Sequence, residues 1–176
     1  MNNKIILSGK ILFDPENKTN KHNYQAAWKR MALIMLDGDI AEYYAWFIKK
    51  RYNLILNKPL RGAHISFIND SNRDIQKGCG LINEKDVDLI WELVKQKWNG
   101  KTIDVTLNTD VRSDGKHWWL NIPEENRQLI HDIRKEIGLD RPFFGLHMSV
   151  GYANEINIVH SKYILGLIEK FGEDYT

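Results

Sequence analysis

Residues 63–67 read Ala-His-Ile-Ser-Phe, and residues 146–150 read Leu-His-Met-Ser-Val. Both stretches follow one pattern, in which apolar residues alternate with a histidine and a serine. In an extended strand, alternate side chains point to opposite faces, so the imidazole and the hydroxyl share one face and the apolar side chains share the other. We therefore expect two strands that each bury an apolar face and present one His and one Ser on the opposite face.

The repetition of this pattern is more informative than either copy alone. A single His-x-Ser in a strand is common and is usually structural. Histidine is not among the residues that are enriched in strands, so strand preference does not explain two copies. Two imidazoles that titrate near neutral pH, His64 and His147, together with the neutral donors Ser66 and Ser149, suit acid–base cleavage of a phosphodiester.

The elements around the two copies are expected in the same order. Each half should contain a strand, then a helix, then the strand with the motif, and a glycine (Gly62 or Gly145) precedes each motif. This order predicts an α+β arrangement in two similar lobes, each contributing one motif to a shared cleft. The expected ranges are 28–36, 40–51 and 62–68 in the first half, and 116–122, 123–138 and 143–152 in the second.

Further elements follow from apolar periodicity and turn signals. Residues 101–106 and 116–122 should form strands that are joined as a hairpin across Ser113-Asp114-Gly115. On the helix over 40–51, the aromatic residues Tyr44, Trp46 and Phe47 are expected in the core. The remaining expected elements are a long or paired strand over 4–13, a helix over 84–98 and a last helix over 156–171.

Length and composition predict a single domain over residues 1–176. The 25 basic and 23 acidic residues give a formal charge of +2, which argues against a protein that holds duplex nucleic acid by its charge. The one cysteine, Cys79, has no partner for an internal disulfide, and the chain begins without an apolar signal segment. We expect a cytoplasmic protein that does not cross a membrane.

The double His-x-Ser motif resembles the 2H phosphoesterase superfamily. That resemblance implies a bilobal, duplicated fold with antiparallel sheets lining a central cleft and helices outside. More narrowly, residues 9–14, 41–50 and 134–147 and the pair Trp118-Trp119 resemble the phage anti-CBASS phosphodiesterases. This narrower resemblance implies hydrolysis of 3′,5′-phosphodiester bonds in cyclic di- or trinucleotides such as 3′,3′-cGAMP, in a host cytoplasm, as an immune-evasion enzyme.

The superfamily's roles transfer to four residues of this chain. His64 and His147 match the general acid–base pair, and Ser66 and Ser149 match the hydroxyls that hold the phosphate. The resemblance implies no metal and no cofactor. The residues do not decide which histidine is the acid, nor whether the attacking group is a ribose 2′-hydroxyl or water.

Four further residues are candidates for substrate binding. Trp118 and Trp119 are adjacent on a strand and point to opposite faces, so at most one should stack on a base while the other packs in the core. Arg61 could supply a local positive charge near His64. Tyr175, in the polar C-terminal tail, could close over a bound nucleotide.

Other functions use the same residues. An RNA-end 2′,3′-cyclic phosphodiesterase would share the catalytic groups, and a non-catalytic protein could hold a cyclic nucleotide without cutting it. A serine nucleophile is less favoured because no Gly-x-Ser-x-Gly elbow is present. A metal site is less favoured because the histidines lack ligand spacing. The sequence does not predict the oligomeric state.

Overall fold

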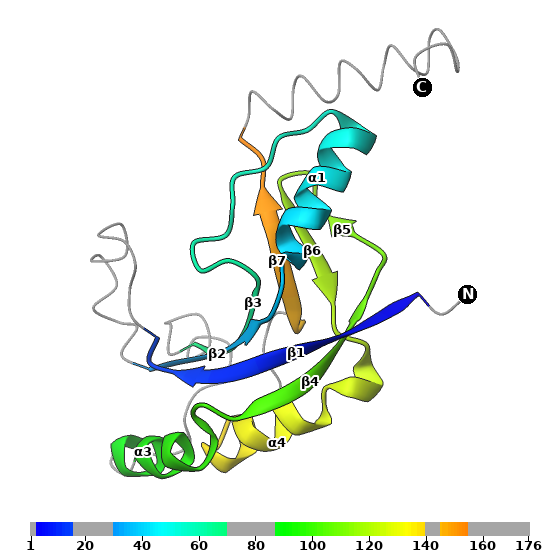
Figure 1. Ribbon diagram of the computed structural model, residues 1–176. Coiled ribbons are helices and arrows are strands. Elements are labelled where there is room, and N and C mark those ends of the chain that lie inside the picture. The colour runs from blue at the N-terminus through cyan, green and yellow to red at the C-terminus, as the bar shows by residue number, and fades with distance from the viewer. Residues whose placement is uncertain (1–2, 16–29, 70–86, 140–144, 155–176) are drawn as a thin grey trace, which may run out of the picture.

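The computed structural model describes residues 3–15, 30–69, 87–139 and 145–154 (Figure 1). These residues form two antiparallel sheets and three α-helices, which confirms the expected α+β class. The strands are β1 (Lys4–Phe13), β2 (Met31–Leu36), β3 (His64–Asn69), β4 (Thr102–Asn108), β5 (Arg112–Ser113), β6 (His117–Asn121) and β7 (His147–Tyr152). The helices are α1 (Ile40–Tyr52), α3 (Val87–Trp98), the short 3-10 helix η2 (Glu124–Asn126) and α4 (Gln128–Glu136).

The first sheet has the strand order β3-β2-β1-β4. Residues 4–13 form one long strand, β1, which pairs with β2 on one side and β4 on the other. Gly9 lies where both partners meet β1, and a Cβ atom there would come within 2.5 Å of Cγ2 of Ile34. The glycine at this position therefore permits the close packing at the centre of the sheet.

The second sheet has the strand order β5-β6-β7, so the expected hairpin between the strands over 101–106 and 116–122 is not formed. The turn is present, but β6 pairs with the two-residue strand β5, whereas β4 pairs with β1. The Asp114 carboxylate accepts hydrogen bonds from the main-chain N–H groups of Lys116 (2.9 Å) and His117 (2.6 Å), which fixes the turn. Val105 and Leu107 of β4 are buried, and this burial holds β4 in the first sheet.

The helix expected from Pro123 is divided into two parts. Residues 124–126 form η2, and α4 begins at Gln128. The end of α4 agrees with the expectation, because Gly138 follows it with a φ of +83°, a conformation that favours glycine.

In each half, the helix that connects two paired strands along the chain packs against the sheet to which those strands do not belong. α1, between β2 and β3, contacts β7, while α4, between β6 and β7, contacts β3. Tyr52 at the end of α1 lies against Trp118 of β6, with ring centroids 5.2 Å apart. This exchange joins the two sheets around one core and brings the edge strands β3 and β7 against each other.

Two of the three aromatic residues expected in the core from α1 are exposed. Tyr44 is 7% exposed, as expected, but Trp46 is 55% exposed and Phe47 is 38% exposed. The buried residues Ala41, Tyr44 and Ile48 follow the three- and four-residue spacing of one helix face. Trp46 lies on the opposite side of the helix, so it cannot reach the same core.

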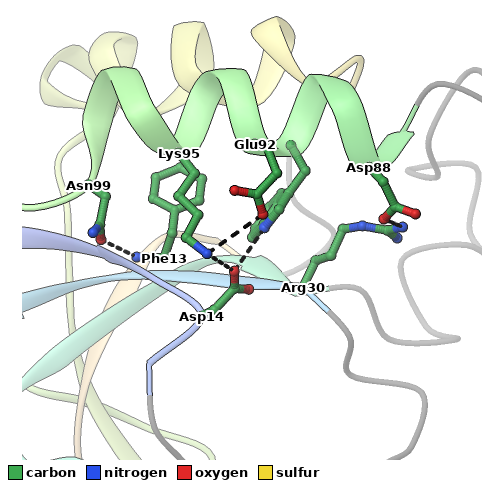
Figure 2. A network of polar contacts seen from close by, with 8 residues as sticks. Phe13, Asp14, Arg30, Asp88, Glu92, Lys95 and Asn99 are labelled. Carbon is green, nitrogen blue, oxygen red and sulfur yellow. Dashed lines mark hydrogen bonds and ion pairs between the residues drawn. The ribbon is translucent and has the colours of Figure 1, made fainter.

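The helix α3 is attached to the end of β1 by a polar network, which Figure 2 shows. Asp14 accepts hydrogen bonds from Trp91 Nε1 at 3.0 Å and from Lys95 Nζ at 2.8 Å. Asn99 Oδ1 accepts from the main-chain N–H of Phe13 at 2.9 Å, and the Phe13 ring lies 4.9 Å from that of Trp91. The Phe13 ring also lies 6.4 Å from that of Phe67, so the network packs α3 against the end of β1 and against β3.

Several expected features lie outside the described residues. These are the last helix over 156–171, the first residues of the helix over 84–98, Cys79 and Tyr175. None of the helices that the structure describes has the length and apolar character required to cross a membrane.

Candidate active site

The first motif strand, β3, is paired with β2. His64 lies opposite Met35 and Ser66 lies opposite Leu33 in the register. Ile65, between them, is fully buried, whereas His64 is half-buried and Ser66 is exposed. The alternation expected from the sequence therefore holds, with the polar pair on one face and the apolar residues in the core.

The second motif strand, β7, is paired with β6 in the same way. His147 lies opposite Asn121, and Ser149 lies opposite Trp119. Both motif side chains are half-buried, and Met148 between them is fully buried. Each motif strand thus pairs with the strand that precedes it in the chain, and each lies at the edge of its sheet.

The two strand pairs share the same irregularity. The register shifts directly after each motif serine, so that Phe67 in β3 and Val150 in β7 have no opposite residue. Such a bulge bends the strand and increases its twist. Main-chain hydrogen bonds match as well, from Leu36 N–H to the Ala63 carbonyl at 3.0 Å and from Ile122 N–H to the Leu146 carbonyl at 3.1 Å.

Both histidine rings are held by the same kind of hydrogen bond. His64 Nδ1 lies 2.8 Å from the Gly62 carbonyl, and His147 Nδ1 lies 2.6 Å from the Gly145 carbonyl. A carbonyl oxygen can only accept, so Nδ1 must donate in each case. When either ring is neutral, Nε2 is consequently the atom with a free lone pair.

The two histidines influence each other electrostatically. Burial lowers the pKa of His64, the hydrogen bond to the Gly62 carbonyl raises it, and the charges of Arg61 and His147 lower it further. His147 is therefore near enough for its charge to be felt at His64, in agreement with the contact between β3 and β7. Around neutral pH, this environment keeps His64 in its neutral form.

The two neighbouring tryptophans have different surroundings. The Trp119 ring lies 6.1 Å from the His147 ring, and its Nε1 donates to Asn121 Oδ1 at 3.0 Å. Trp118 packs against Tyr52 of α1, on the opposite face of the strand. The structure therefore places Trp119, and not Trp118, on the face that carries His147 and Ser149.

Arg61 lies close to the first histidine, as its effect on the pKa of His64 indicates. Burial also lowers the pKa of the Arg61 guanidinium, which is half-buried. Its charge therefore acts in a partly desolvated setting, where an electrostatic effect is stronger than in water. Tyr175, the other candidate for substrate binding, lies outside the described residues.

The sequence analysis missed two residues near these strands. Asn121 lies opposite His147 and holds the Trp119 ring; its position two residues after Trp119 places it on the same face. Arg134 of α4 is 1% exposed and donates to the Phe67 carbonyl. Its spacing from the buried Ile130 and Ile133 places it on the apolar helix face, a signal that could have revealed a buried cation.

Among the residues that the structure describes, no group of three or more His, Cys, Asp or Glu side chains is arranged so that it could hold a metal ion. Comparisons with protein-family models, with curated proteins and with solved structures found no match. The interpretation of the site therefore depends on its geometry and on the motif pair.

Proposed function

We propose that this protein is a phosphodiesterase that cleaves cyclic oligonucleotides, with His64 and His147 as its acid–base pair. The observation that carries the proposal is that both histidines occupy the same register position and have the same Nδ1 anchor in two different sheets. A purely structural histidine would not need such a counterpart. The same correspondence supports a duplicated, two-lobed fold of the 2H phosphoesterase type.

His64 is the general base in this proposal. Burial and the charges of Arg61 and His147 lower its pKa, so its Nε2 carries a free lone pair at neutral pH. Acid–base catalysis then requires a second group that begins the reaction protonated. We assign this role to His147, the other histidine of the motif pair, because its Nδ1 is engaged with the Gly145 carbonyl and its Nε2 is left to donate a proton to the leaving oxygen.

In the proposed reaction, one histidine accepts a proton from the attacking oxygen and the other donates a proton to the leaving oxygen. Nε2 of His64 takes the proton of the attacking hydroxyl, from a ribose or from water, as its oxygen bonds to phosphorus. The bond from phosphorus to the leaving oxygen breaks, and Nε2 of His147 gives its proton to that oxygen. Ser66 and Ser149 donate hydrogen bonds to the non-bridging oxygens, whose negative charge increases in the transition state.

The substrate class follows from the anti-CBASS resemblance, and three features are compatible with it. Trp119 offers a flat surface beside His147 on which a base can stack. Arg61 supplies a positive charge near His64. The formal charge of +2 suits a small anionic ligand better than a long duplex.

The experiment is incubation of the full chain with cyclic di- and trinucleotides and with an RNA that ends in a 2′,3′-cyclic phosphate. EDTA is present throughout, and the products are separated by chromatography. We expect linear products from the rings and no change in the RNA. Cleavage of the RNA end alone would overturn the proposed substrate, and binding of the rings without any product would overturn the proposed activity.

The catalytic roles are tested by His64→Ala and His147→Ala. Loss of a general acid or base typically costs about 10²- to 10⁴-fold in rate, so each variant should lose activity in that range while keeping its fold by circular dichroism. His117→Ala is the matched control, because His117 is an exposed histidine of β6 whose ring contacts Asp114. Near-normal turnover in either site variant would rule out the acid–base pair.

A further inference from the structure

The outer face of α1 carries aromatic side chains that the fold leaves in solvent. Tyr43 and Trp46 are each 55% exposed, and Phe47 is 38% exposed. The ring centroids of Tyr43 and Trp46 lie 6.4 Å apart, so these side chains form one patch. In Figure 1, α1 lies on the outside of the molecule, in front of β6 and β7. Exposed apolar patches of this kind mark interaction surfaces.

Opposite charges occupy the two ends of the same helix. Asp39 and Glu42 lie at its beginning, Lys49 and Lys50 lie at its end, and all four residues are exposed. Lys50 follows Trp46 by four residues, so the two share one stripe of the surface. Glu42 and Lys49 are seven residues apart and flank this stripe on one side.

We propose that α1 pairs with α1 of a second copy of this chain, antiparallel and about a two-fold axis. If the two-fold axis crosses the helix pair midway between residues 44 and 45, Tyr43 lies opposite the partner's Trp46. In the same register, Lys50 lies opposite the partner's Asp39. The partner's Lys49 lies level with position 40, two residues or about 3 Å along the helix from Glu42, an offset that the long lysine side chain can span. A two-fold axis forms every such contact twice, so one register satisfies both the aromatic patch and the charges.

Other binding partners would match the charges on the outer face of α1 less well. A parallel helix pair would bring Lys49 and Lys50 against the same residues of the partner. A single-stranded nucleic acid could stack on Trp46, but its phosphates would be repelled by Asp39 and Glu42 at the other end of the face. The antiparallel pair alone places each charged end against an opposite charge.

The size of the helix sets the expected strength of the dimer. Thirteen residues of α-helix rise about 20 Å, so the interface contains few layers of side chains. Such an interface lies at the small end of the range for specific complexes. We therefore expect monomer and dimer in equilibrium at micromolar concentrations, independently of any phosphodiesterase activity.

The test is sedimentation of the full chain over a range of concentrations. The measured mass should rise from 20.7 kDa toward twice that value as the concentration increases. Trp46→Glu should stay monomeric, because the two-fold axis brings a new charge into each aromatic contact. Since Trp46 lies outside the core, the variant should keep its fold, which circular dichroism checks.

Reversal of single charges provides a test of the register. Glu42→Lys alone and Lys49→Glu alone each turn two attractive contacts into repulsive ones, and each should weaken the dimer by about tenfold. The double variant exchanges the charges and should recover most of the original affinity. Lys58→Ala is the control. Lys58 forms an ion pair with Glu42 of the same chain, with 3.6 Å between Nζ and Oε1, so its loss should leave the dimer unchanged.

Three results would overturn this proposal. They are a chain that remains monomeric at every concentration, a Trp46→Glu dimer of unchanged strength, and charge reversals that are not rescued in combination. Binding of a single-stranded oligonucleotide that Lys49→Glu weakens and Glu42→Lys strengthens would identify the face as a nucleic-acid surface instead.

Discussion

Arg134 of α4 donates a hydrogen bond from its guanidinium to the main-chain carbonyl of Phe67, the residue directly after Ser66. The side chain is 1% exposed, so a cation lies inside the core. Phe67 is the bulged residue of β3 and has no opposite residue in β2. The contact therefore ties the helix of the second half to the irregular position beside the first motif.

Replacement of this buried cation should destabilise the protein. Arg134→Met keeps much of the side-chain length but leaves the Phe67 carbonyl without its charged donor. Hydrogen bonds to charged groups contribute about 1.5–3 kcal/mol, so we expect the free energy of unfolding in urea to fall by about that amount. Lys135→Met, at the exposed neighbouring position, should change it by less than about 0.5 kcal/mol. Equal stability of the two variants would contradict this role of Arg134.

Gly151 should be sensitive to the addition of one methyl group. A Cβ atom there would lie 2.6 Å from the Asn57 carbonyl oxygen, and Asn57 pairs with Tyr152 through main-chain hydrogen bonds of 2.8 and 3.1 Å. Gly151→Ala must push this segment away from β7, and overpacking of this kind costs about 1–3 kcal/mol.

The matched control for this substitution is Gly145→Ala. A Cβ atom at Gly145 meets nothing within 4 Å, and its backbone is outside the left-handed region. Its unfolding free energy should stay within about 0.5 kcal/mol of the unsubstituted chain. If Gly151→Ala unfolds at the same urea concentration as this control, the segment at Asn57 can move away from β7 without a loss of stability, and the prediction is wrong.

Local periodicity predicted the parts of the fold that depend on neighbouring residues. The alternation in the two motifs placed Ile65 and Met148 in the core and the His and Ser residues on the other faces, as the structure shows. Burial of every second side chain is a property of the strand itself, so it can be recognised in the sequence. The strand–helix–strand order of both halves was predicted for the same reason.

Pairing between distant segments could not be predicted in this way. The strand β4 carries alternating apolar residues that would suit either sheet, and its burial against β1 decides the choice. Trp46 has the composition of a core residue, but the exchange of α1 onto the second sheet leaves its side of the helix in solvent. The anchors of His64 and His147 are likewise main-chain carbonyls, which carry no sequence signal.

The pH dependence of the site should respond to Arg61. Its positive charge disfavours the protonated form of His64, so Arg61→Gln should raise the pKa of His64. If His64 is the base, activity is lost as the pH falls through this pKa, and the acidic limb of the rate profile should move to higher pH in the variant.

The pKa of His64 can be measured without substrate by titration of its ring signals in NMR spectra. The unsubstituted chain should give a value below 6.5, and Arg61→Gln should give a higher one. Arg51→Gln is the control, because Arg51 is an exposed arginine in the last turn of α1. An unchanged or lower pKa in Arg61→Gln would show that the guanidinium does not act on this ring.

Trp119 should determine how tightly a substrate base is held. Its ring lies on the same face as His147 and Ser149 and is oriented by the hydrogen bond to Asn121. Stacking on an aromatic side chain contributes about 1–3 kcal/mol per base, so Trp119→Ala should raise KM by roughly 5- to 150-fold. Because the acid–base pair is retained, kcat should change much less.

Trp119→Phe separates stacking from a structural effect of the same position. The phenyl ring keeps a flat surface but cannot donate to Asn121, so KM should lie between those of the Ala variant and the unsubstituted chain. Steady-state kinetics on a cyclic dinucleotide gives both constants for each variant. If instead kcat falls and KM is unchanged in both variants, Trp119 acts by holding the His147 ring in place, and the base must be recognised elsewhere.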